Sequence, residues 1–234
     1  MTVNSGKKSS LFLLFLIVVI VFFRFCIENR NQKPEKDIKA VDTGIAEEET
    51  DICIALTFDD GPHPVWTEKL LDGLKERGIC ATFFVIGENA EKNPELIRKM
   101  IENGNQVGNH TYSHVQLTEC RPETAIKEIS RTQEAVYKAA KIYPRYIRPP
   151  YGSWNEYLQS ETELKTVLWD VDPMDWKVQN TDQIVASVMK QTKDGAIILL
   201  HDIYETSVES ALKIADIYLA AGYRFCTVEE IGIE

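Results

Sequence analysis

The chain has fewer basic than acidic residues. Its 234 residues include 26 Lys and Arg against 36 Asp and Glu, which gives a formal net charge of -10. Proteins that bind nucleic acids usually carry a basic surface, so this acidic balance argues against a nucleic-acid partner. The same balance mildly disfavours a polyanionic substrate.

Cysteine pairs at close spacing are also lacking. The chain has five cysteines, and none forms a C-x-x-C pair, which argues against a thiolate zinc site and a redox motif. Cys53 and Cys80 lie in apolar, strand-like runs, where a free cysteine acts as a small buried hydrophobe. We therefore expect no disulfide framework, and the odd number leaves at least one free thiol.

One long apolar run is present, from Leu11 to Phe23, and Lys7 and Lys8 precede it. A basic segment before an apolar one is typical of an export signal. As a helix the run spans about 20 Å, which is short for a hydrocarbon core of about 30 Å. Residues 9–27 make a marginal span, and no small-x-small cleavage site follows closely. We expect residues 1–27 to be retained as a signal anchor, with cleavage and secretion as the alternative.

Two signals bear on the orientation of this anchor. Basic residues follow the run at Arg30, Lys33, Lys36 and Lys39, which does not favour an external C-terminal domain. An N-terminal signal nevertheless translocates a long domain whatever its charge, so we expect a membrane protein whose main domain lies outside the cytoplasm. Residues 28–50 are polar and rich in Glu and Lys, which is typical of a flexible linker.

Residues 51–234 alternate between strand-like and helix-like segments. Helices are predicted from Asn93 to Gly104, over 123–140 and over 208–221, each with an apolar face. This alternation predicts an α/β fold with about seven parallel strands, closed or nearly closed into a barrel, and a doubly wound sheet is the alternative. The predicted strands are 52–58, 81–86, 105–110, 145–149, 166–171, 196–201 and 223–228.

Polar side chains follow the ends of these predicted strands. In either architecture the functional site lies at the carboxyl ends of the strands. Three of the four histidines lie there, and the fourth, His63, is next to an acid pair. The strand-end residues are Asp59-Asp60, His110, His114, Arg148 to Tyr151, Asp172, Asp175-Trp176 and His201-Asp202.

The spacing of His110 and His114 indicates a metal site. On one helical turn, residues four apart face the same way, as a divalent metal requires, although two unrelated surface histidines are the alternative. A carboxylate from another strand end would complete three protein ligands. Three ligands leave a position open for water, which is the catalytic pattern.

The adjacent acids Asp59 and Asp60 fit such a site if they have different roles. One can bind the metal while the other stays free as a base, and the cation offsets their mutual repulsion. Gly61 and Pro62 end the strand, so both carboxylates can lean into one cavity. Without the histidines, a solvated Asp-Asp-Gly-Pro turn would be the better interpretation.

The segment from Arg148 to Tyr151 places a rigid amide donor after a cation. Pro149 and Pro150 have no N–H, so the Tyr151 amide is the next donor and can form half of an oxyanion hole. Arg148 can pair with the free Asp and keep it ionised. A Pro-rich loop with a surface Arg is the alternative.

His201 ends an apolar strand, where a single histidine is usually a satisfied core residue. With a metal site at the same strand ends and Asp175 as its partner, a general acid is the better interpretation. Trp176 and Leu199 can line a small apolar pocket, although each taken singly is typical of a core.

Taken together, these residues resemble the polysaccharide deacetylases, carbohydrate esterase family 4, which share the NodB homology domain. All five ordered motifs of that family occur, and the resemblance covers residues 51–234, the whole globular part. The motifs are Thr57 to Pro62, His110 to His114, Arg148 to Tyr151, Asp172 to Trp176 and Leu199 to His201.

The resemblance implies an irregular (β/α) barrel that hydrolyses N-acetyl groups on amino-sugar polymers. It implies that Asp60, His110 and His114 hold a divalent metal, commonly zinc, with Co²⁺, Ni²⁺, Mn²⁺ or Fe²⁺ as alternatives. The other implied roles are Asp59 as base, Arg148 as its orienting partner, the Tyr151 amide as oxyanion donor, His201 as acid, Asp175 as its tuning partner, and Trp176 and Leu199 as acetate pocket.

With the expected external anchor, the resemblance favours N-acetylglucosamine or N-acetylmuramic acid of peptidoglycan as the substrate. An O-acetyl esterase of the xylan type and a chitooligosaccharide deacetylase are the enzymatic alternatives. A non-catalytic glycan-binding module is less favoured, because binding alone needs neither the base Asp59 nor the acid His201. No obligate protein partner is expected.

Overall fold

The computed structural model describes residues 52–232. The predicted anchor at 1–27 and the predicted linker at 28–50 therefore lie outside the described residues, and both stay predictions. Within residues 52–232, no helix combines the length and the apolar character needed to cross a membrane.

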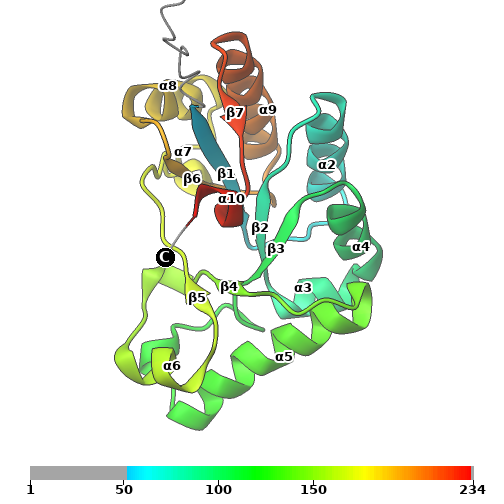
Figure 1. The fold of residues 1–234 in the computed structure, drawn as a ribbon, viewed down its shortest axis with the longest axis vertical. Helices are drawn as coiled ribbons and strands as arrows, with labels where there is room; N and C mark the ends of the chain where they lie inside the picture. The colour runs from blue at the N-terminus through cyan, green and yellow to red at the C-terminus, as the bar shows by residue number, and fades with distance from the viewer. Residues whose placement is uncertain (1–51, 233–234) are drawn as a thin grey trace, which may run out of the picture. The chain divides into compact units, whose positions relative to one another are not determined.

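Seven parallel strands form a single sheet (Figure 1), as predicted. The strand order is β5-β4-β3-β2-β1-β6, and β7 pairs with the start of β1. β1 pairs with three strands, β2, β6 and β7, which is more than any other described strand. The strands are β1 (Cys53–Asp59), β2 (Thr82–Val85), β3 (Gln106–Asn109), β4 (Tyr146–Ile147), β5 (Lys165–Thr166), β6 (Ile197–His201) and β7 (Arg224–Phe225).

The segment after β5 brings the two edges of the sheet together. Val171 forms a parallel bridge with Ile198 of β6, and the Leu199 N–H donates to the Val171 carbonyl at 2.9 Å. The sheet is therefore a nearly closed, irregular barrel. This is the first of the two predicted architectures, and the doubly wound sheet was the other.

The predicted strand at 166–171 is wrong over most of its length. β5 ends at Thr166, and the carbonyl oxygens of Val167 and Leu168 accept hydrogen bonds from the Arg148 guanidinium. These carbonyls serve a buried side chain instead of a strand ladder, so the apolar character of the segment does not make it a strand.

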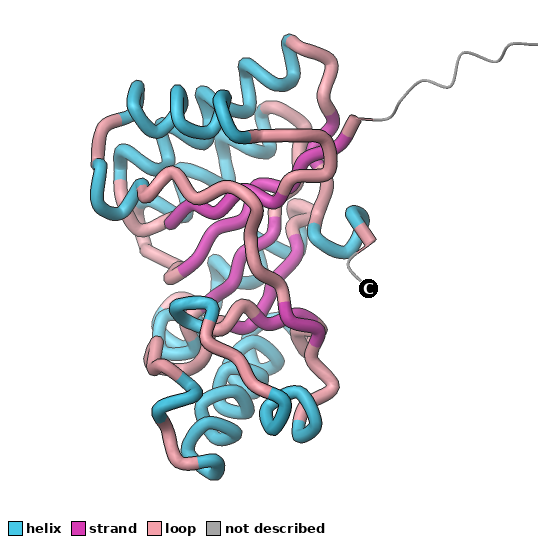
Figure 2. The backbone as a smooth tube through the Cα atoms, turned by 90° about the vertical axis from the view of Figure 1, so that its left-hand side faces the viewer, coloured by secondary structure: helices cyan, strands magenta, loops and turns pink. Residues whose placement is uncertain are grey.

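Helices lie along the outside of the strands (Figure 2). The predicted helices at 93–104, 123–140 and 208–221 are confirmed as α4, α5 and α9, although Leu219 of α9 is 37% exposed and faces away from the core. The helices are α2 (Trp66–Glu76), α3 (Gly87–Lys92), α4 (Pro94–Glu102), α5 (Pro122–Ala140), α6 (Glu156–Glu161), α7 (Asp175–Val178), α8 (Thr181–Gln191), α9 (Glu205–Ala220) and α10 (Val228–Ile231), with 3₁₀ turns η1 (Leu117–Glu119) and η2 (Pro150–Gly152).

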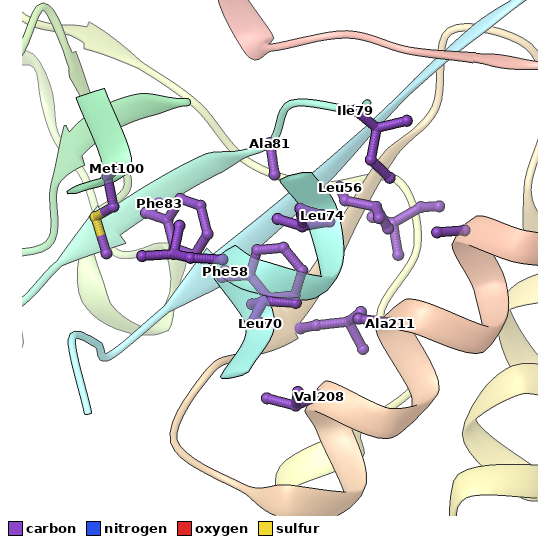
Figure 3. Close-up of a cluster of buried hydrophobic side chains, with 14 of the residues drawn as sticks. Leu56, Phe58, Leu70, Leu74, Ile79, Ala81, Phe83, Met100, Val208 and Ala211 are labelled. Atoms are coloured by element: carbon purple, nitrogen blue, oxygen red, sulfur yellow. The ribbon is translucent and has the colours of Figure 1, made fainter. Parts of the chain in front are cut away.

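The main core lies between the central strands and helices α2 and α9 (Figure 3). Phe58 of β1 stacks on Phe83 of β2 with ring centroids 5.2 Å apart, and Leu70 of α2 and Ala211 of α9 are fully buried in the same cluster. Burying each large apolar side chain stabilises the fold by about 1.5–3 kcal/mol. This packing fixes the carboxyl end of β1, where Asp59 lies.

A disulfide joins Cys53 and Cys226, so the expectation that Cys53 is a free, buried cysteine is wrong. Cys53 begins β1, and Cys226 directly follows β7, which pairs with β1, so the two Cα atoms lie 6.1 Å apart. The two cysteines are 173 residues apart in the sequence, so only the strand order brings them together. Among residues 52–232, Cys80 and Cys120 are free thiols.

Replacing Cys53 with Ser is expected to destabilise the fold by about 2–5 kcal/mol, because the disulfide closes a very long loop. Urea unfolding followed by circular dichroism measures this difference. Cys80→Ser is the matched control, since it removes a half-buried thiol that forms no disulfide. Equal stability of the two variants would contradict a stabilising role for the disulfide.

Candidate active site

A cavity of about 360 Å³ opens at the carboxyl ends of the strands. Eight of the ten predicted site residues line it, and the other two, Arg148 and Asp175, are fully buried behind it. The lining residues are Asp59, Asp60, His110, His114, Pro149, Tyr151, Trp169, Asp172, Trp176, Leu199, His201 and Tyr204.

Three of the lining residues form a candidate metal site. Oδ1 of Asp60 lies 3.4 Å from Nε2 of His110 and 3.4 Å from Nε2 of His114. This Oδ1 atom is buried and has no hydrogen-bond partner among residues 52–232, which is costly unless a cation binds there. The three residues therefore fit a divalent metal that takes nitrogen and oxygen ligands.

The electrostatics of two of the three ligands, Asp60 and His114, favour the forms that bind a metal. Burial raises the pKa of Asp60, but the neighbouring histidines outweigh it and the net shift is downward, which favours the carboxylate. Burial lowers the pKa of His114, which favours the neutral imidazole. Burial lowers the pKa of His110, but the charges of Asp59 and Asp60 outweigh it and the net shift is upward, so a metal would displace a proton from this imidazole. Nδ1 of His110 lies 2.6 Å from the carbonyl oxygen of Arg148 and donates to it, so Nε2 is the nitrogen that faces Asp60 and is available as a ligand.

The two histidines do not share a helical turn, so the predicted reason for their convergence is wrong. β3 ends at Asn109, and residues 110–114 form a loop. Thr111 and His114 have φ values of 65° and 57°, in the left-handed region. The loop doubles back and brings the imidazole rings to a centroid distance of 5.1 Å. The i, i+4 spacing therefore identified the right pair through a different geometry.

Asp59 and Asp60 enter the same cavity because the strand ends between them. Asp59 is the last residue of β1, and Asp60 has a φ of 74°, which breaks the alternation of side chains one residue before the expected Gly61. Arg148 holds Asp59 from behind, with its Nη1 atom 2.9 Å from Oδ1 of Asp59 and 2.7 Å from Oγ1 of Thr57. This pairing leaves Oδ2 of Asp59 directed towards the metal site, 3.7 Å from Nε2 of His110.

A second buried carboxylate holds His201. Oδ1 of Asp175 lies 2.8 Å from Nδ1 of His201, and Oδ2 accepts the backbone N–H of the same residue at 2.8 Å. Burial lowers the pKa of His201, but the hydrogen bond and charge of Asp175 outweigh it and raise the pKa to about 9. His201 is therefore protonated at neutral pH, with Nε2 free to donate.

The stability of the metal-free protein is expected to depend on the His201 proton. A pKa raised from 6.5 to about 9 contributes stability that is complete below pH 6.5 and is lost as the pH rises through 9. The free energy of unfolding of wild type relative to His201→Asn should fall by up to about 3 kcal/mol over that interval. Urea unfolding in chelator from pH 6 to 10 measures it, with His63→Asn as control, because His63 lies outside the cavity lining. Parallel curves for wild type and His201→Asn would argue against the raised pKa.

The cavity also contains aromatic residues that sequence reasoning missed. The predicted strand at 166–171 includes Trp169. In the structure Trp169 lies in the irregular segment after β5, and its ring lies beside the Arg148 guanidinium. Tyr204 lies three residues after the end of β6, so its position near a strand end was sufficient to predict that it lines the cavity. Tyr151 and Trp176, both predicted, are 68% and 46% exposed, so they form the mouth of the cavity rather than its core.

Residues 46–167 match the family model described as polysaccharide deacetylase. The chain belongs to the polysaccharide deacetylase family. Peptidoglycan-N-acetylmuramic acid deacetylase PdaC of Bacillus subtilis is 41% identical over 202 residues, which are 86% of this chain and 43% of that protein. Peptidoglycan-N-acetylglucosamine deacetylase PgdA of Listeria monocytogenes is 39% identical over 178 residues, which are 76% of this chain and 38% of that protein.

The fold of the family is shared as well. The structure of PdaC from Bacillus subtilis aligns with a TM-score of 0.77 at 44% identity, covering 78% of this chain and 90% of the solved one. A family 4 carbohydrate esterase from Streptomyces lividans, solved in complex with acetate, aligns with a TM-score of 0.68 at 38% identity, covering 74% of this chain and 90% of that one. The chain spans about two fifths of the length of the curated PdaC and PgdA proteins.

Proposed function

We propose that this polysaccharide deacetylase removes N-acetyl groups from the amino sugars of peptidoglycan with the help of a divalent metal, most simply Zn²⁺. The observation that carries the proposal is one cavity in which Asp60, His110 and His114 converge beside Asp59 and His201. Two imidazoles and a carboxylate are a usual ligand set for a catalytic zinc. The names of PdaC and PgdA, which specify peptidoglycan, support this substrate class.

Asp59 is the general base of the proposed reaction. Arg148 binds Oδ1 of Asp59 and holds the carboxylate in place, so Oδ2 is free to take a proton from the attacking water. When bound, the metal supplies positive charge that lowers the pKa of water and stabilises negative charge. The water oxygen forms a bond to the amide carbon, and the Tyr151 N–H donates to the developing oxyanion.

His201 is the general acid that completes the reaction. Because Asp175 holds Nδ1, the other nitrogen, Nε2, gives its proton to the departing amine as the carbon–nitrogen bond breaks. Leu199 and Trp176 enclose the methyl group of the acetyl unit. The products are acetate and a free amino sugar, and no covalent enzyme intermediate is needed.

Acetate release tests the proposal. The purified, Zn²⁺-loaded chain is incubated in parallel with peptidoglycan fragments, chitooligosaccharides and acetylated xylan. Acetate from peptidoglycan, together with free amines on the sugars, is the expected result. Release from xylan alone would identify an O-acetyl esterase, and release from chitooligosaccharides alone would correct the substrate. No acetate from any of the three would overturn the enzyme proposal in favour of a glycan-binding module.

We also propose that the domain acts outside the cytoplasm, held at the cell membrane by residues 1–27. The Cys53–Cys226 disulfide supports this location, because disulfides persist in oxidising compartments and are rare in the cytosol. Protease added to intact protoplasts should degrade the domain if it is external. Protection until the membrane is permeabilised would place it in the cytoplasm.

A further inference from the structure

The carboxylate of Glu128 binds the loop that joins the two histidines. Glu128 lies on α5, and its Oε2 atom accepts the backbone N–H of Tyr112 at 3.1 Å and that of Ser113 at 2.8 Å. The same oxygen accepts the Ser113 hydroxyl at 3.0 Å. One carboxylate oxygen therefore takes three donors from two consecutive residues that lie between His110 and His114.

The loop depends on such contacts because it is neither a helix nor a strand. Its amides have no regular backbone ladder, and a buried N–H without a partner destabilises the fold. Tyr112 is 7% exposed, so water cannot readily replace the carboxylate at its amide. The preceding amide, that of Thr111, donates to Oδ1 of Asn109. Glu128 thus completes the set of acceptors for the amides of residues 111–113.

The backbone of the loop is also strained at two positions. Thr111 and His114 have positive φ values, a conformation that is unfavourable for residues other than glycine. Such conformations persist only where surrounding contacts hold them. On the side of α3, the N–H groups of Gly87 and Glu88 donate to the carbonyls of Thr111 and Tyr112 at 2.9 and 3.0 Å. On the side of α5, the corresponding contact is the Glu128 carboxylate.

We propose that Glu128 is a positioning residue for the metal site. By fixing the loop against α5, it sets the left-handed turn at His114 and so holds Nε2 of that residue 3.4 Å from Oδ1 of Asp60. Metal affinity falls steeply when ligands move by a few tenths of an ångström. The inference rests on the proposed function, because it concerns the cation that Asp60, His110 and His114 would hold.

Titration of the metal-free chain with Co²⁺ tests this role without any assay of activity. The visible absorption of bound Co²⁺ reports the ligand geometry, and competition with a chelator gives the dissociation constant. Glu128→Ala is expected to bind Co²⁺ about 10- to 100-fold more weakly than wild type, with an altered spectrum. The loss of a residue that supports a metal ligand from outside usually weakens metal binding by this factor. Glu134→Ala is the matched control, because Glu134 lies on the same helix and contacts Tyr143 instead of the loop.

Glu128→Gln keeps the shape of the side chain and one acceptor oxygen, so it folds even if Glu128→Ala does not. It should weaken Co²⁺ binding about two- to tenfold, because neutral acceptors form weaker hydrogen bonds than carboxylates. Wild-type affinity and spectrum in Glu128→Gln and in any folded Glu128→Ala would overturn the inference. Wild type that binds no Co²⁺ would instead overturn the proposed metal site, so the two failures are distinguishable.

Discussion

Asp59→Asn is expected to lower kcat by about 10²- to 10⁴-fold while metal binding stays close to that of wild type. Asparagine fills the same space and can still contact Arg148, but it cannot take a proton from water. Asp60→Ala should instead lose the metal, because it removes the buried oxygen that lies 3.4 Å from both imidazoles. Steady-state acetate release and metal analysis by mass spectrometry, carried out on the same preparations, separate the two effects.

The comparison of these adjacent residues decides which of them is the base. Loss of metal in Asp59→Asn, or retention of metal together with activity in Asp60→Ala, would reverse the proposed division of labour. The buried position of Asp59, 3% exposed, requires a check that each variant is folded. Near-ultraviolet circular dichroism provides it, because four tryptophans report on the tertiary packing.

Arg148→Met is expected to destabilise the fold by about 3–5 kcal/mol, the loss that usually follows when a buried ion pair is broken. The guanidinium is 0% exposed, and its removal leaves the Asp59 carboxylate buried without its cation. It also leaves the carbonyl oxygens of Val167 and Leu168 without their donor. Urea unfolding of the metal-free proteins measures the difference.

Arg145→Met is the control for this substitution. Arg145 pairs with Glu229, but its side chain is 70% exposed, so its loss should change stability by no more than about 1 kcal/mol. Adding Asp59→Asn to Arg148→Met should recover part of the lost stability, because no buried charge is then left unpaired. If Arg148→Met were as stable as Arg145→Met, the buried pair would not be a structural requirement.

The position of the site was predictable because parallel strands deliver their carboxyl ends to one edge. Asp59 and His201 end apolar strands and His110 follows the short strand β3, and these strand-end positions predict that the three residues share one cavity. The path of the chain between strands was less predictable. The His110–His114 loop turns through left-handed backbone, which non-glycine residues adopt only when tertiary contacts impose it.

Residues whose role depends on distant partners gave no local signal. Glu128 lies in a helix, where an acid is normally read as a solvated side chain, and its function appears only when α5 packs against the loop. The Cys53–Cys226 disulfide depends on β7 pairing with β1, which no spacing along the chain encodes. Trp169 was misplaced for a similar reason, since the carbonyl oxygens just before it serve Arg148 rather than a neighbouring strand.

The pairing of β1 with three other strands has a consequence for the order in which the protein is made. Ribosomes deliver β1 before the other described strands, yet its partner β6 pairs it from Ala55 to Asp59 with residues 197–201, close to the end of the chain. Until those residues emerge, one edge of β1 stays open, and open apolar edges promote aggregation. If the domain is exported, as proposed above, and crosses the membrane unfolded, β1 and β6 are both present when folding begins, and the disulfide then joins the first described strand to the residue that follows the last one.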